Sequence, residues 1–193
     1  VLAGTAEAAA AQPPPIQDVE VSKLPAPDAF TASGRDTGLP ASLWTGASAQ
    51  TAKTVLPLLA AKPLSPAAAA LARRVLATGA PGPKDIGRDP ALAAARANAL
   101  MFQGDPKAAA AVLARAPGLD RNSDLARAAA ESALLANDNP RACQLADGLS
   151  VGRDEVYWLK LRTFCQASAG QAAEARLTFD LVQAQVKDPI FTR

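Results

Sequence analysis

Apolar residues in the last third of the chain recur with the period of an α-helix. Four of them fall at intervals of three and four residues and would share one buried helical face: Ala142, Leu145, Ala146 and Leu149. Residues 154–170 and 172–186 repeat this pattern. The pattern therefore predicts three consecutive helices joined by short turns.

Start and stop signals divide the preceding chain into five more helices. A Ser, Asp or Asn before Pro marks a start, because the polar side chain caps free backbone N–H groups and Pro lacks an N–H of its own. Asn139 and Asp154 are the expected caps of the sixth and seventh helices. About eight helices result, over residues 48–61, 65–79, 89–104, 105–116, 122–137, 139–149, 154–170 and 172–186. The expected fold class is all-α, which an Ala-rich chain with only 4% aromatic residues also favours.

The turns between paired helices return at nearly constant intervals. Gly104, Asp138 and Gly170 mark three such turns, and the second interval is only slightly shorter than the first. A small residue follows five positions into each turn: Ala109, Cys143 and Ala175. Over residues 90–186 this pattern resembles tetratricopeptide repeats, with Glu131 and Thr163 as departures where that repeat has small residues. The resemblance implies a right-handed α-solenoid of helical hairpins.

The expected domain organisation places an extended arm before the helices. Residues 1–46 are rich in Pro and Ala, and residues 1–11 resemble the end of a secretory signal peptide. An N-terminal helical hairpin (47–80), a loop (81–89) and the repeats (90–193) follow, and we expect the repeats to continue in the full-length protein. The arm carries four apolar residues that would bind a partner protein: Ile16, Val19, Val21 and Leu24.

The two cysteines are symmetric about one turn. Cys143 and Cys165 lie equally far along the chain from Asp154, so antiparallel helices would bring them to the same height. A disulfide there would stabilise the fold by about 3 kcal/mol in the chain-entropy model. Two free thiols packed as small core residues are the alternative. Together with the leader, the pair favours a periplasmic protein, with a cytosolic one as the second possibility.

Several kinds of chemistry are excluded by composition. The chain has no histidine, which removes Ser-His and Cys-His nucleophiles and imidazole metal ligands. A net charge of +2 without a basic tract makes nucleic acid a poor partner, and no apolar run is long enough to span a bilayer. We therefore expect no catalytic residues, metal or cofactor. The candidate site is a peptide-binding groove formed by Tyr157, Trp158, Lys160 and Arg162, with packing of the aromatic residues in the core as the alternative.

The expected function is that of a non-catalytic scaffold or adaptor in a large cell-envelope assembly, such as a flagellar motor or secretion apparatus. Its partners would be other proteins, with a homo-oligomeric ring as one arrangement. The alternative is a regulatory or substrate-holding domain of a peptidoglycan enzyme, since similar helical hairpins occur in lytic transglycosylases and Glu131-Ser132 resembles their acid-serine pair. Residues 38–44 and 158–166 also resemble uncharacterised Ala-rich envelope proteins of alphaproteobacteria.

Overall fold

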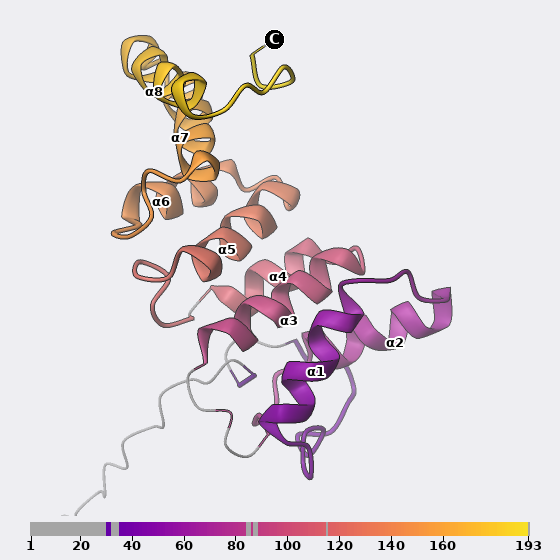
Figure 1. Ribbon diagram of the computed structural model, residues 1–193. Coiled ribbons are helices and arrows are strands. Elements are labelled where there is room, and N and C mark those ends of the chain that lie inside the picture. The colour runs from indigo at the N-terminus through magenta and orange to yellow at the C-terminus, as the bar shows by residue number, and fades with distance from the viewer. Residues whose placement is uncertain (1–29, 32–34, 84–85, 87–88, 115, 193) are drawn as a thin grey trace, which may run out of the picture.

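A computed structural model describes residues 30–31, 35–83, 86, 89–114 and 116–192 of the chain (Figure 1). This part is all-helical and contains no named strand; an isolated β-bridge joins Arg35 and Thr78. Its eight helices are α1 (Ala49–Leu59), α2 (Pro66–Ala77), α3 (Pro90–Phe102), α4 (Pro106–Leu113), α5 (Ser123–Leu135), α6 (Asn139–Gly148), α7 (Val156–Ser168) and α8 (Ala172–Gln185). The all-α expectation is thus confirmed for the described residues.

Local capping explains where most of these helices begin. The side chains of six N-cap residues accept a backbone N–H from the first turn: Ser48, Ser65, Asp89, Asp105, Asn122 and Asp138. Two expected caps are wrong. Asp138 caps α6 in place of Asn139, because its carboxylate reaches the N–H of Arg141. Glu155 precedes α7 in place of Asp154, and its carboxylate accepts from the Ser123 hydroxyl and makes no capping bond.

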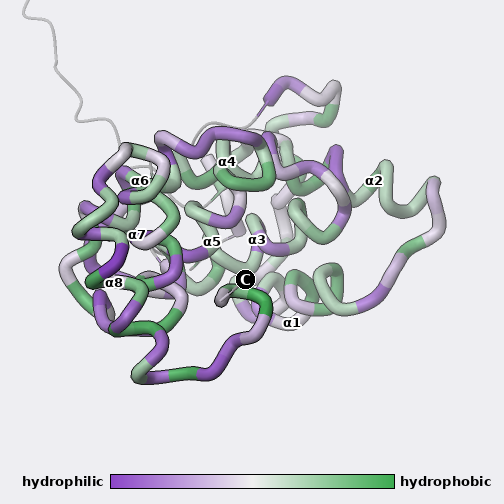
Figure 2. The backbone as a smooth tube through the Cα atoms, turned by 90° about the horizontal axis from the view of Figure 1, so that it is seen from above, coloured by the Kyte–Doolittle hydropathy of each residue, from purple (hydrophilic) through white to green (hydrophobic). Residues whose placement is uncertain are grey.

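The helices are arranged in chain order from α1 at one end to α8 at the other (Figure 1). Neighbours in sequence pack as the pairs α3/α4, α5/α6 and α7/α8, and α3 also packs closely on α5. Many contacts are made by alanines, of which Ala97, Ala109 and Ala130 are completely buried. Small side chains let helix backbones approach closely. Apolar and hydrophilic residues alternate along the helices, as one buried face requires (Figure 2).

The two N-terminal helices lie against α3, and α2 also touches α4. A mainly apolar cavity of about 120 Å³ lies where α1 approaches the end of α2, and Trp44, Leu56 and Leu76 are among its lining residues. The segment expected to form a hairpin (47–80) therefore consists of two helices that α3 holds in place.

A completely buried arginine on α3 fixes the end of α2. Arg96 donates from Nε to the carbonyl of Leu76 at 2.7 Å and from Nη2 to that of Thr78 at 2.8 Å. These carbonyls belong to the end of α2, where no further turn of helix supplies a donor. The guanidinium also lies 5.0 Å from the ring centre of Phe30. One cation thus joins three segments of the chain.

The described part of the expected arm packs on the helices. Phe30 is completely buried, and its ring meets that of Trp44 edge to face at 4.9 Å. The backbone N–H of Arg35 donates to the carbonyl of Ala77 at 2.9 Å, and its guanidinium pairs with Asp105. Residues 35–46 and Phe30 therefore belong to the helical body. The leader at 1–11 and the arm residues Ile16, Val19, Val21 and Leu24 lie outside the described residues.

Candidate functional site

An apolar cleft of about 330 Å³ lies between α5 and α7. It is lined by Leu134 of α5 and by four residues of α7: Tyr157, Lys160, Leu161 and Phe164. The α7 residues are three and four positions apart, so they share one side of that helix. The cleft exists because α5 and α7 do not pack closely along their length, in contrast to α3 and α5.

The structure separates the four residues predicted to form a groove. Tyr157 and Lys160 line the cleft, whereas Trp158 is completely buried in the core. Arg162 does not line the cleft and instead feels the charges of Arg153 and Asp147. Residues next to each other on a helix point about 100° apart, so the four cannot share a face. The stripe from Tyr157 to Phe164 at intervals of three and four is the signal that identifies the cleft.

Trp158 anchors the beginning of α7 to the beginning of α5. Its indole Nε1 donates to the hydroxyl of Ser123 at 2.9 Å, and that hydroxyl donates to the Glu155 carboxylate at 3.0 Å. A buried indole needs such a partner for its N–H. The two helices are therefore joined at their N-terminal ends, and apart from Tyr157 the residues that line the cleft lie further along them.

Tyr157 connects the cleft to charged residues of α5. The Arg127 guanidinium lies 4.7 Å from the centre of its ring and donates to Glu131 at 2.8 Å. Burial, reinforced by the nearby Glu131 carboxylate, raises the pKa of Tyr157 to about 12, although Arg127 opposes the shift. The phenol is therefore neutral at physiological pH. Its hydroxyl is shielded from solvent and has no hydrogen-bond partner among the described residues.

A second, polar hollow adjoins the cleft through Arg127. It measures about 340 Å³ and is lined by Asn98 and Ala94 of α3 and by Asp124, Arg127, Ala128 and Glu131 of α5. Arg127 therefore lines the hollow while its guanidinium covers the ring of Tyr157, which lines the cleft. An apolar and a polar compartment thus meet at one side chain. Sequence analysis missed Arg127, Asn98 and Leu134, because only helix packing places them beside α7.

Lys160, at the edge of the cleft, is held by the segment after α8. Its ammonium pairs with Asp188 and lies 5.4 Å from the ring centre of Phe191. The ring of Phe191 stacks on that of Phe179 with centres 5.5 Å apart. The hydrogen bond from Lys160, together with backbone N–H donors, lowers the pKa of Asp188. The positive charge of Lys160 is thus already paired.

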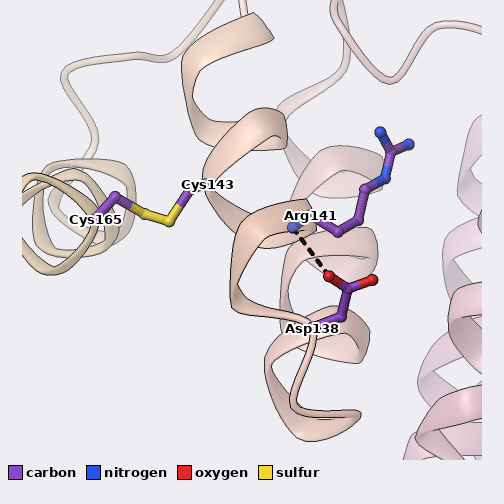
Figure 3. The surroundings of a disulfide bond; sticks show 4 residues. All are labelled: Asp138, Arg141, Cys143 and Cys165. Carbon is purple, nitrogen blue, oxygen red and sulfur yellow. Dashed lines mark hydrogen bonds between the residues drawn. A yellow bond between two sulfur atoms is a disulfide. The ribbon is translucent and has the colours of Figure 1, made fainter. Parts of the chain in front are cut away.

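The predicted disulfide joins α6 to α7 (Figure 3). The Cα atoms of Cys143 and Cys165 are 5.7 Å apart, within the usual range for a disulfide. Around it, the Nε and Nη2 atoms of Arg162 and the Oε1 atom of Gln166 are shielded without a hydrogen-bond partner in the described part of the chain. Burial, and to a lesser extent the charge of Arg153, lowers the pKa of Arg162.

The acid-serine pair has a structural explanation. Glu131 accepts from Arg127, and Ser132 is completely buried with its hydroxyl donating to the carbonyl of Ala129 at 2.8 Å. Among the described residues, no group of three or more Cys, Asp or Glu side chains is arranged to hold a metal, and none of their helices is both long and apolar enough to cross a membrane. The sequence matches no known family, and no curated protein or solved structure is detectably similar to it.

Proposed function

We propose that this protein is a non-catalytic adaptor that binds a segment of another protein in the cleft between α5 and α7. The observation that carries the proposal is the cleft itself, where Leu134, Tyr157 and Phe164 present apolar surface to solvent-accessible space. Phe164 is 42% exposed. An apolar hollow of this kind, with polar residues beside it, is typical of binding surfaces for large apolar side chains.

The lining of the two compartments defines the chemistry of the partner. The cleft suits one or two large apolar side chains, because its lining is almost wholly apolar. In the polar hollow, Glu131 is paired with Arg127, while Asp124 and Asn98 also face the space. The complementary partner is therefore a segment with an apolar anchor followed by hydrogen-bonding or basic residues. Electrostatic matching of this type sets specificity more than affinity.

The repeat pattern and the disulfide support a role for this protein in a larger assembly. Paired helices in chain order, with turns that return at nearly constant intervals, support a tetratricopeptide-like right-handed solenoid, whose surfaces bind proteins. The disulfide supports an oxidising compartment, which for an envelope protein is the periplasm. We propose a scaffold role in a multi-subunit envelope assembly, such as a flagellar motor or secretion apparatus, with residues 16–24 as a second contact.

Site-specific photo-crosslinking in the native envelope tests the proposal. The full chain carries p-benzoylphenylalanine in place of Phe164, or in place of Leu177 of α8, which is 68% exposed, as the control. We expect adducts at Phe164 that are absent at Leu177 and are lost when Leu134→Glu is added. Mass spectrometry identifies the captured segment, which should contain a large apolar residue.

A synthetic peptide of the captured segment completes the test. Its affinity for the full chain should fall about tenfold or more with Phe164→Glu, since a buried charge would face an apolar side chain, and should not change with Leu177→Glu. Circular dichroism confirms that both variants keep their helices. Equal adducts at the two positions, or equal affinities of the two variants, would refute the cleft as the binding site.

A further inference from the structure

The last helix pair is attached to the rest of the protein in an uneven way. Trp158 joins the beginning of α7 to Ser123 at the beginning of α5. Beyond this point α7 packs on α8 and on α6, while the cleft separates its later turns from Leu134 near the end of α5. α7 is therefore joined to α5 at its beginning, while its later turns pack on α6 and α8 and do not pack closely on α5.

The disulfide lies in this later part of α7. Cys165 is seven residues beyond Trp158, which is two turns or about 10 Å along the helix. It shares its part of the helix with Leu161 and Phe164, which line the cleft. The bond to Cys143 thus ties this later part of α7 to α6 (Figure 3).

The polar groups around the disulfide do not favour this arrangement by themselves. The Nε and Nη2 atoms of Arg162, three residues before Cys165, and the side-chain Oε1 atom of Gln166, one residue after it, are shielded without a hydrogen-bond partner among the described residues. Shielded groups of this kind would be better solvated if α7 moved away. The covalent bond thus joins α6 and α7 in a part of α7 where two side chains carry polar atoms without a partner.

We propose that the Cys143–Cys165 disulfide is a redox-controlled strut that sets the width of the α5–α7 cleft, so that reduction allows α7 and α8 to move about Trp158 and changes the binding surface. The effect of reduction on binding rests on the proposed function, because the cleft is the proposed binding site. Both cysteines are partly exposed, so a thiol can reach the bond.

The reductant is a dithiol. One of its thiolates attacks a sulfur of the disulfide and forms a mixed disulfide, and the other cysteine leaves as a thiolate that takes up a proton. The second thiol of the reductant then displaces the remaining cysteine in the same way. Two electrons and two protons pass to the protein, which gains two thiols, and the dithiol becomes a cyclic or protein disulfide. Oxidation by a disulfide of the same class reverses the reaction.

Phe164 provides a readout that needs no partner. It lines the cleft in the later part of α7, so p-trifluoromethylphenylalanine introduced at this position alone gives one fluorine NMR resonance. The full chain is compared oxidised, reduced with excess dithiothreitol, and as the Cys143→Ala/Cys165→Ala variant. We expect the solvent isotope shift of the resonance, measured between H₂O and D₂O, to change at least twofold on reduction, with the same change in the variant and an unchanged helical circular dichroism spectrum.

Two results would overturn the inference. An identical resonance in the oxidised and reduced protein would mean that packing alone holds α7 in place. Loss of the helical spectrum on reduction would mean that the disulfide maintains the fold and does not adjust a cleft. The fluorine measurement is independent of peptide binding, so the strut can fail while Phe164→Glu still weakens a peptide, and the strut can be confirmed when no peptide binds.

Discussion

Replacing the buried Arg96 by methionine should destabilise the protein strongly. Methionine fills similar space but donates no hydrogen bond, so it leaves the carbonyls of Leu76 and Thr78 buried and unpaired. Each unpaired buried carbonyl costs about 1–3 kcal/mol. Loss of the cation from the ring of Phe30 costs about 1 kcal/mol more.

The net effect is smaller than this sum, because removing a buried charge also removes its desolvation cost. We expect the free energy of unfolding to fall by about 3 kcal/mol, which is a large share of the roughly 5–15 kcal/mol typical of a domain. Arg96→Lys should lose less, about 1–2 kcal/mol, since an ammonium keeps the charge but lacks the planar fork that reaches both carbonyls.

Urea unfolding followed by far-UV circular dichroism measures these differences. Arg121→Met is the matched control: Arg121 is 76% exposed, and its pair with Asp120 should be worth less than about 1 kcal/mol. A loss below about 1 kcal/mol for Arg96→Met, or one equal to that of Arg121→Met, would refute the argument that Arg96 holds α2. A lower slope of free energy against urea would show that the mutation also loosens the native state.

Three further predictions concern the backbone at two glycines, the ionisation of Tyr157 and the segment before the helices. Gly170→Ala should lower the free energy of unfolding by about 1 kcal/mol because φ at Gly170 is +76°. Gly148→Ala, at the last residue of α6, should raise the free energy of unfolding by up to about 1 kcal/mol because Gly148 has ordinary backbone angles and open space beside it. Thermal melts that shift equally for the two variants would contradict this difference in backbone conformation. A titration followed by absorbance at 295 nm should show Tyr157 ionising with a midpoint at about pH 12. The stability that its burial confers is complete below pH 10 and is lost as the pH rises through 12. A midpoint near pH 10 would mean that the cleft is open to water around Tyr157. Deleting residues 1–40 should lower the melting temperature by several degrees because the buried Phe30 is removed. Differential scanning calorimetry measures this change, and an unchanged melting temperature would mean that Phe30 does not stabilise the helices.

The sequence predicted those features that depend on local chemistry. Helix starts were found because an N-cap side chain and a following proline act within one turn, as Asp105 and Pro106 do. The cysteine pair was found because helices rise by a constant amount per residue, so equal distances from a turn give equal heights. Gly170 was placed correctly in the left-handed conformation for the same local reason.

The residues predicted to form one groove lie on different sides of α7, because the sequence does not say which side of this helix faces the core. Trp158 and Lys160 are only two residues apart in the sequence, yet Trp158 is completely buried and Lys160 lines the cleft. The choice depends on where α5, α6 and α8 lie around α7. Those positions result from contacts between residues far apart in the chain, such as Trp158 with Ser123.

Only the tertiary structure determines that Arg96 and Phe30 are buried and that the cleft exists. A charged residue on a helix is normally solvated, and the carbonyls at the end of α2 together with the ring of Phe30 make burial of Arg96 favourable. A phenylalanine in a proline-rich segment has no helical pattern to follow, and the ring of Trp44 determines where Phe30 packs. The cleft exists because α7 meets α5 at one end only, and no local pattern encodes the angle between two helices.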